Sequence, residues 1–129
     1  MPLEPGLAAS FRYAVTDADT AVALGSGDVA VLGTPKVVAL VEQASCAAVL
    51  EHIPPDMTTV GTRVIMDHVV PTPVGVSVRV EAVLESVEGR RLTFGVHVSD
   101  DERTVASGQV HRTLVTREKF ERAAQRSSE

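Results

Sequence analysis

Hydrophobic residues recur at every second position over much of the second half of the chain, a pattern typical of β-strands with one buried face. The run "VGVSVRVEAVL" (74–84) places Val, Ala or Leu at every even position and mostly Gly or polar residues at odd positions. After a turn at Glu88-Gly89, "RLTFGVHVS" (91–99) repeats this alternation. We predict strands here, one more over roughly 104–116, one that ends at His68, and an early one in "ASFRYAVTD" (9–17).

A helical pattern occupies the stretch that begins at "LGTPKVVALVEQAS" and ends before "PP". Thr34 suits the N-cap, because its hydroxyl can accept a hydrogen bond from a backbone N–H one turn further on. Pro35 suits the first helical position, where its missing N–H is not needed. A narrow polar strip on the helix is marked only by Lys36, Gln43 and Glu51. A helix this apolar is expected to be buried on nearly all sides, by a sheet wrapped around it and by a second subunit.

The order of elements is a strand, a long helix, about four strands in hairpin connection, and a short helix in "TREKFERAAQ" with Thr116 as its cap. The glycine-punctuated "GSGDVAVLG" before the long helix predicts a loop or a short helical turn. This order favours an α+β fold whose antiparallel sheet is solvated on one face. The length and the absence of a linker or repeat indicate one domain over residues 1–129, with about the last five residues as a solvated tail.

Composition excludes several classes of function. The formal charge of −5 gives no broad basic surface, so nucleic acid is not an expected partner. No apolar run approaches the roughly 20 residues of a membrane span. No basic region followed by an apolar one is visible near the N-terminus, so we do not expect an export signal. The single cysteine, Cys46, cannot form an intramolecular disulfide and predicts a reducing, cytoplasmic location. The histidines have no metal-ligand spacing and no phosphate loop or dinucleotide fingerprint occurs, so we expect neither a metal nor a cofactor.

Glu42 stands out because it is a carboxylate at the margin of the apolar stripe of the long helix. Such a group loses solvation, and its pKa rises unless it is paired or hydrogen-bonded. A simpler interpretation is a helix-surface glutamate at a subunit or solvent edge, and the helix alone does not decide between the two.

His68 lies where an apolar strand ends before a proline-marked break, and it titrates in the range useful for catalysis. A structural strand histidine remains the commoner case, and His111 on the last strand competes with it. Thr34 is most simply a cap, yet its hydroxyl lies where the helix dipole favours developing negative charge. Cys46 is more simply an apolar filler than a nucleophile. Thr34, Glu42 and His68 together form a set suited to acyl transfer.

These residues also carry a resemblance. The chain resembles the hot-dog fold acyl-CoA thioesterases, and among them most closely the fluoroacetyl-CoA thioesterases, from about Phe11 to Phe120. The matching features are Thr34 followed eight residues later by Glu42, Gly61 seven residues before His68, and three short stretches. These stretches are "SVEGRRL" (86–92), "SG" followed by Arg112, and "EKF" (118–120).

The resemblance implies an antiparallel sheet around a long central helix, in a homodimer with active sites at the subunit interface. It implies catalytic roles for Thr34, Glu42 and His68, and a role for the Gly61 backbone N–H in holding the thioester carbonyl. Arg112 matches an arginine that the resemblance puts near the ligand. Coenzyme A would be part of the substrate rather than a cofactor.

One departure concerns the acyl group. The phenylalanine lid of the fluoroacetyl-specific relative aligns with Gly25 and Asp28 here, so the aromatic gate is missing. We therefore expect a thioesterase that hydrolyses an acyl-CoA to acid and CoA, with a short, medium or aromatic acyl group. The alternative is a non-catalytic hot-dog protein that binds acyl-CoA or another small ligand. A hot-dog hydratase is disfavoured, because no matching Asp–His pair precedes the helix.

Overall fold

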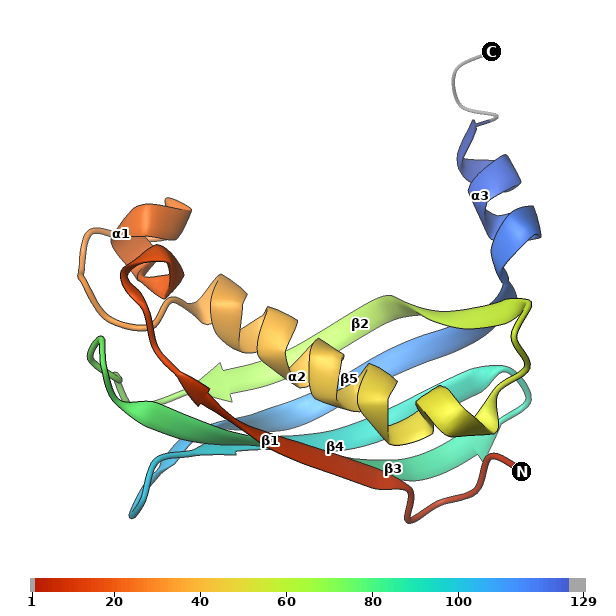
Figure 1. Cartoon of the computed structure of the whole chain (residues 1–129), viewed down its shortest axis with the longest axis horizontal. Coiled ribbons are helices and arrows are strands. Elements are labelled where there is room, and N and C mark those ends of the chain that lie inside the picture. The colour runs from red at the N-terminus through yellow and green to blue at the C-terminus, as the bar shows by residue number, and fades with distance from the viewer. Residues whose placement is uncertain (1, 126–129) are drawn as a thin grey trace.

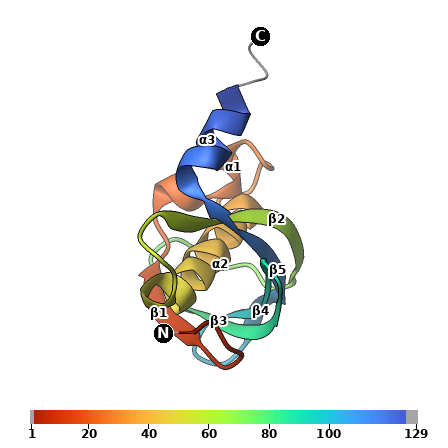
Figure 2. The same ribbon diagram turned by 90° about the vertical axis from the view of Figure 1, so that its right-hand side faces the viewer.

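The computed structural model describes residues 2–125, and a single antiparallel sheet curls around one long helix (Figures 1 and 2). The sheet has five strands in the order β1-β3-β4-β5-β2. The strands are β1 (Ala8–Ala14), β2 (Met57–His68), β3 (Ser77–Glu88), β4 (Arg91–Ser99) and β5 (Thr104–Thr116). The helices are α1 (Ala21–Leu24), α2 (Thr34–Val49) and α3 (Arg117–Gln125), with 3₁₀ turns η1 (Asp17–Asp19) and η2 (Leu50–His52).

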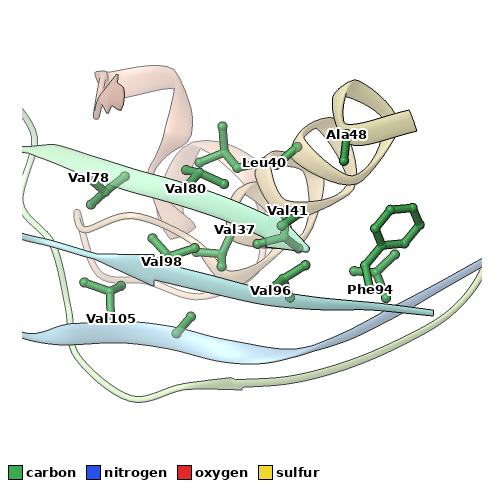
Figure 3. Close-up of a cluster of buried hydrophobic side chains, with 14 of the residues drawn as sticks. Val37, Leu40, Val41, Ala48, Val78, Val80, Phe94, Val96, Val98 and Val105 are labelled. Atoms are coloured by element: carbon green, nitrogen blue, oxygen red, sulfur yellow. The ribbon is translucent and has the colours of Figure 1, made fainter. Parts of the chain in front are cut away.

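The predicted alternation is confirmed in β3 and β4. The even-numbered side chains are buried from Val78 to Leu84 in β3 and from Leu92 to Val98 in β4, and the odd-numbered ones between them are less buried. An irregularity in the pairing between Leu84 and Ser86 ends this phase in β3, and beyond it the odd-numbered Val87 packs against the core. Figure 3 shows valines, leucines, alanines and a phenylalanine of the two strands and α2 in contact. Each such side chain contributes about 1.5–3 kcal/mol when fully buried, so this layer is the main support of the fold.

The connection of β2 differs from the predicted succession of hairpins. β3–β4 and β4–β5 are hairpins, but β2 pairs with β5 at the far edge of the sheet. Both edges of β3 are occupied, by β1 and by β4, so β2 cannot pair with the strand that follows it in the chain. The chain between β2 and β3 therefore crosses over, and β2 is an edge strand with one neighbour.

Some predicted boundaries move by a few residues. β1 ends at Ala14 rather than 17, and the first residues of the 74–84 run precede β3. The short helical turn is α1, which comes before the glycine-punctuated stretch rather than within it. The C-terminal helix is found as predicted. Most of the predicted solvated tail lies outside the described residues.

The sheet covers one side of the long helix, and the predicted second subunit would have to cover the rest. Its buried residues face the sheet, but a continuous face remains exposed in the single chain. That face carries Ala39, Gln43, Ala47 and Leu50, the last of which is 67% exposed. The uncovered face borders the edge strand β2 in Figure 2.

Candidate active site

Thr34 is the first residue of α2, and the predicted N-cap role is wrong. The N-cap is Gly33, which has extended backbone and makes no side-chain capping bond. Because Thr34 lies inside the first turn, its hydroxyl is not used on the helix's own backbone. It shares a hydrogen bond of 2.8 Å with Nδ1 of His68 instead. The first turn of the helix therefore brings together two of the predicted site residues.

His68 is the last residue of β2 and is half-buried. Its Nε2 atom is buried and has no hydrogen-bond partner among the described residues. Burial lowers the pKa of His68 below its ordinary value of 6.5, although a backbone hydrogen bond at Val70 partly counteracts this. The ring is therefore neutral near pH 7 and can accept a proton, which is what a general base requires.

The start of α2 is fixed by the segment that precedes it. The Gly33 N–H donates to the Asp19 carbonyl at 2.9 Å, and Lys36 forms an ion pair with the Asp19 carboxylate at 3.5 Å. A Cβ at Gly33 would lie 3.1 Å from the backbone of Ala21, so glycine permits α1 to pack closely against the helix start. These contacts hold the backbone of Thr34 in place.

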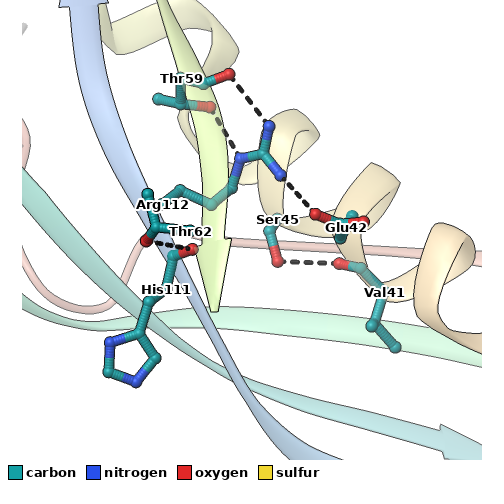
Figure 4. Close-up of polar contacts among 7 residues, drawn as sticks. All are labelled: Val41, Glu42, Ser45, Thr59, Thr62, His111 and Arg112. Atoms are coloured by element: carbon teal, nitrogen blue, oxygen red, sulfur yellow. Dashed lines mark hydrogen bonds and ion pairs between the residues drawn. The ribbon is translucent and has the colours of Figure 1, made fainter. Parts of the chain in front are cut away.

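Glu42 lies two turns further along α2 and is paired, as Figure 4 shows. Its Oε2 accepts a hydrogen bond of 3.1 Å from Nη1 of Arg112. The Arg112 side chain is 9% exposed and reaches across from β5. Its Nε donates to the Thr59 hydroxyl at 2.9 Å, and its Nη2 donates to the Thr59 carbonyl at 3.0 Å. The carboxylate at the margin of the apolar stripe is thus matched by a buried guanidinium.

Gly61 gives this ion pair its space. It lies opposite Arg112 in the β2–β5 pairing, next to an irregularity between Gly61 and Arg63. A Cβ on Gly61 would collide with Oε2 of Glu42 and lie 3.3 Å from Nη1 of Arg112. Glycine at this position therefore leaves room for the close approach of the Glu42 carboxylate, and its role is not an unusual backbone angle.

The predicted site residues thus form two clusters within one chain. The first is Thr34 with His68, and the second is Glu42 with Gly61, Arg112 and Thr59. Eight residues separate Thr34 from Glu42, about 12 Å along the helix. Seven residues separate Gly61 from His68, about 23 Å along the strand. Thr59 had no signal of its own in the sequence, because its role depends on the register between β2 and β5.

The other candidates lie apart from these clusters. Figure 4 shows the His111 ring on the opposite side of β5 from the Arg112 side chain. Cys46 is free and half-buried. Across residues 2–125 no group of His, Cys, Asp or Glu is arranged to hold a metal ion. Within the same range, no helix has the length and apolar character needed to span a bilayer.

A five-stranded antiparallel sheet around a long helix defines the class: this is a hot-dog fold protein. A hot-dog-like protein from Thermanaerovibrio acidaminovorans has the same fold, with a TM-score of 0.89 at 19% identity over 97% of this chain and 93% of that one. The family model for the fluoroacetyl-CoA-specific thioesterases matches residues 15–118. The chain belongs to this family.

Individual relatives agree with this assignment. The fluoroacetyl-CoA thioesterase of Streptantibioticus cattleyicolor is 37% identical over 90 residues, which cover 70% of this chain and 65% of that protein. The match thus spans slightly less than two thirds of the relative's length. A solved structure of the fluoroacetyl-CoA thioesterase FlK has a TM-score of 0.92 at 28% identity, covering 98% of both chains. A structure of an FlK mutant with fluoroacetate and CoA has a TM-score of 0.86 at 30% identity, covering 92% of this chain and 99% of that one.

Proposed function

We propose that this protein hydrolyses an acyl-CoA thioester, consuming water and releasing a carboxylic acid and CoA. The observation that carries the proposal is the hydrogen bond between Thr34 and a neutral His68. A hydroxyl next to an imidazole base is a common arrangement for activating a nucleophile or a water molecule. Membership in the thioesterase family supports an acyl-CoA as the substrate class.

We further propose that the active form is a homodimer in which each site takes one cluster from each copy. The Thr34–His68 and Glu42–Arg112 clusters start about 12 Å apart along α2 in one chain, which favours a site that takes them from two copies. The edge strand β2 has a free side, and the uncovered face of α2 borders it. Antiparallel pairing of two β2 strands would bring the His68 end of one copy toward the Met57 end of the other. The symmetric contact would cover both free surfaces.

In the proposed mechanism the thioester carbonyl lies near the Gly61 backbone N–H, which stabilises the oxyanion of the tetrahedral intermediate. His68 takes a proton from the attacking group and returns it to the departing thiolate. Thr34 orients the His68 ring or the substrate. Glu42, held by Arg112, either orients the attacking water or attacks the carbonyl as a carboxylate. In the second route CoA leaves as the thiolate when the anhydride forms, and His68 takes its proton from the water that then cleaves the anhydride.

We propose that the enzyme does not select its acyl group by a fluorine substituent. The two positions that align with the phenylalanine lid are Gly25, which ends α1 with a φ of 74°, and the exposed Asp28. Neither supplies an aromatic ring to enclose a very small acyl group. A short or medium aliphatic chain, or an aromatic acid, does not need that enclosure. The cytoplasmic location inferred from the single cysteine belongs to the same proposal.

A panel of acyl-CoA esters, from acetyl to aromatic, tests the reaction by detection of the released thiol. We expect turnover with at least one ester, and fluoroacetyl-CoA no better than acetyl-CoA. Absence of turnover above buffer across the panel would remove the enzyme interpretation. Tight acyl-CoA binding in a calorimeter without turnover would then favour the non-catalytic binding protein.

A further inference from the structure

The helices α1 and α3 rise from the same side of the molecule (Figures 1 and 2), and Figure 1 shows them at opposite ends of β2. Neither contains a buried residue. A helix as short as either is not stable in water without packing against other groups. Both also expose large apolar side chains within the single chain. Around α1 these are Val22, Leu24 and Val29, which are 53%, 42% and 56% exposed, and on α3 the residue is Phe120, at 46%.

A cleft of about 220 Å³ lies at the base of α3. It is lined by Arg90, Val115, Thr116, Lys119 and Phe120. The side chains of Arg90 and Lys119 have no carboxylate partner in the described part of the chain, whereas Arg122 on the same helix is paired with Glu118. The cleft therefore combines an apolar floor with two uncompensated positive charges.

The α1 segment has the complementary character. Between residues 16 and 33 the chain carries three aspartates and neither lysine nor arginine. Asp19 is buried and used by Lys36, but Asp17 and Asp28 are exposed. Exposed apolar groups flanked by carboxylates match a cleft of apolar groups flanked by cations.

Two-fold symmetry brings these surfaces together. In an antiparallel β2–β2 dimer the α3 end of one copy lies beside the α1 end of the other, since the two helices project from opposite ends of that strand. We infer that α3 of one copy docks on the α1 segment of a second copy, with Phe120 against the apolar side chains around α1 and Lys119 facing Asp28. This inference rests on the proposed dimeric site. In it, α3 acts as an arm of one copy that packs against the α1 segment of the other copy, next to the start of α2 that carries Thr34.

The test is the dimer dissociation constant, measured by sedimentation for the full chain. Phe120→Thr is expected to weaken the dimer roughly tenfold, whereas Val83→Thr, at a residue 43% exposed on the outer face of the sheet, leaves it unchanged. Lys119→Glu and Asp28→Lys each weaken the dimer, and the double variant recovers most of the loss. Because Phe120 is 46% exposed and is not part of the buried core cluster, thermal unfolding should show that the Phe120→Thr protomer remains folded.

A second readout separates this contact from the reaction. In a Cys46→Ser background, Val22→Cys and Phe120→Cys together should give a covalent dimer with a short bismaleimide, and each alone should not. If the protein is dimeric and active but Phe120→Thr, Lys119→Glu and the cross-link have no effect, the arm contact is wrong and the proposed function stands. If the variants weaken CoA binding but not dimerisation, the cleft holds the substrate's phosphates and the inference is overturned. A monomeric protein would overturn both the inference and the composite site.

Discussion

Thr34 and His68 are joined by one hydrogen bond between partly accessible side chains, whereas Arg112 is held in a buried position by three bonds to Glu42 and Thr59. The first pair keeps a neutral base and an available ring nitrogen, features that serve chemistry and add little to stability. The second pair joins α2 to β2 and β5, and a loss there leaves buried groups unpaired. The comparison predicts that variants of the first pair lose activity and variants of the second lose both activity and stability.

The largest expected effect follows from His68→Ala. Loss of a general base lowers kcat by about 10²–10⁴-fold, while loss of one neutral hydrogen bond costs about 1 kcal/mol of unfolding free energy. Steady-state hydrolysis and urea unfolding measure the two quantities on the same preparation. If His68→Ala lowers the free energy of unfolding by several kcal/mol, His68 is structural, and the two pairs do not differ as proposed.

Arg112→Ala should have the largest effect on stability. It removes one partner of a mostly buried ion pair and both donors to Thr59, at a cost of about 3 kcal/mol. Arg112→Lys serves as the control, because it keeps the charge but cannot reproduce the planar guanidinium contacts, so an intermediate loss is expected. Urea unfolding that gives the same midpoint for all three proteins would contradict the comparison.

Gly61→Ala should perturb the Glu42–Arg112 ion pair less than Arg112→Ala does. The new methyl group pushes the Glu42 carboxylate away from Arg112, at about 1 kcal/mol, since the glutamate end can shift. Gly27→Ala is the matched control, because its methyl group would meet only Ala21 at 3.5 Å, an ordinary contact. Equal stabilities of the two variants in a thermal melt would count against a close-approach role for Gly61.

The smallest expected effect is a difference between the two pairs in how the free energy of unfolding depends on pH. The pKa of His68 is lower in the folded protein than in the unfolded chain, so the unfolded state binds more protons just below pH 6.5. This component of stability is present above pH 6.5 and is lost as the pH falls through the folded pKa. His68→Gln should flatten the stability profile in that window. An unchanged slope would mean that burial does not perturb the ring.

The fold and the site could be predicted from the sequence to different extents. Period-two alternation is a local property, so β3, β4 and β5 could be predicted, and the all-apolar helix indicated a wrapped sheet. The edge position of β2 depends on which strand edges are free, which no local pattern reports. Glu42 was recognisable as a misfit, but its partner lies 70 residues away and meets it only through the β2–β5 register. Thr34 is predicted as the cap because Thr followed by Pro favours a helix start. In the structure the cap is one residue earlier, at Gly33.

The most direct test of the central claim, that each site takes one cluster from each copy, is complementation between two inactive variants. His68→Ala and Glu42→Gln are purified separately, and their subunits are exchanged in equal amounts. If the clusters act across the interface, half of the dimers are mixed and each contains one intact site of two, giving about a quarter of wild-type activity. Activity that stays at the mean of the two separate variants would contradict the composite site.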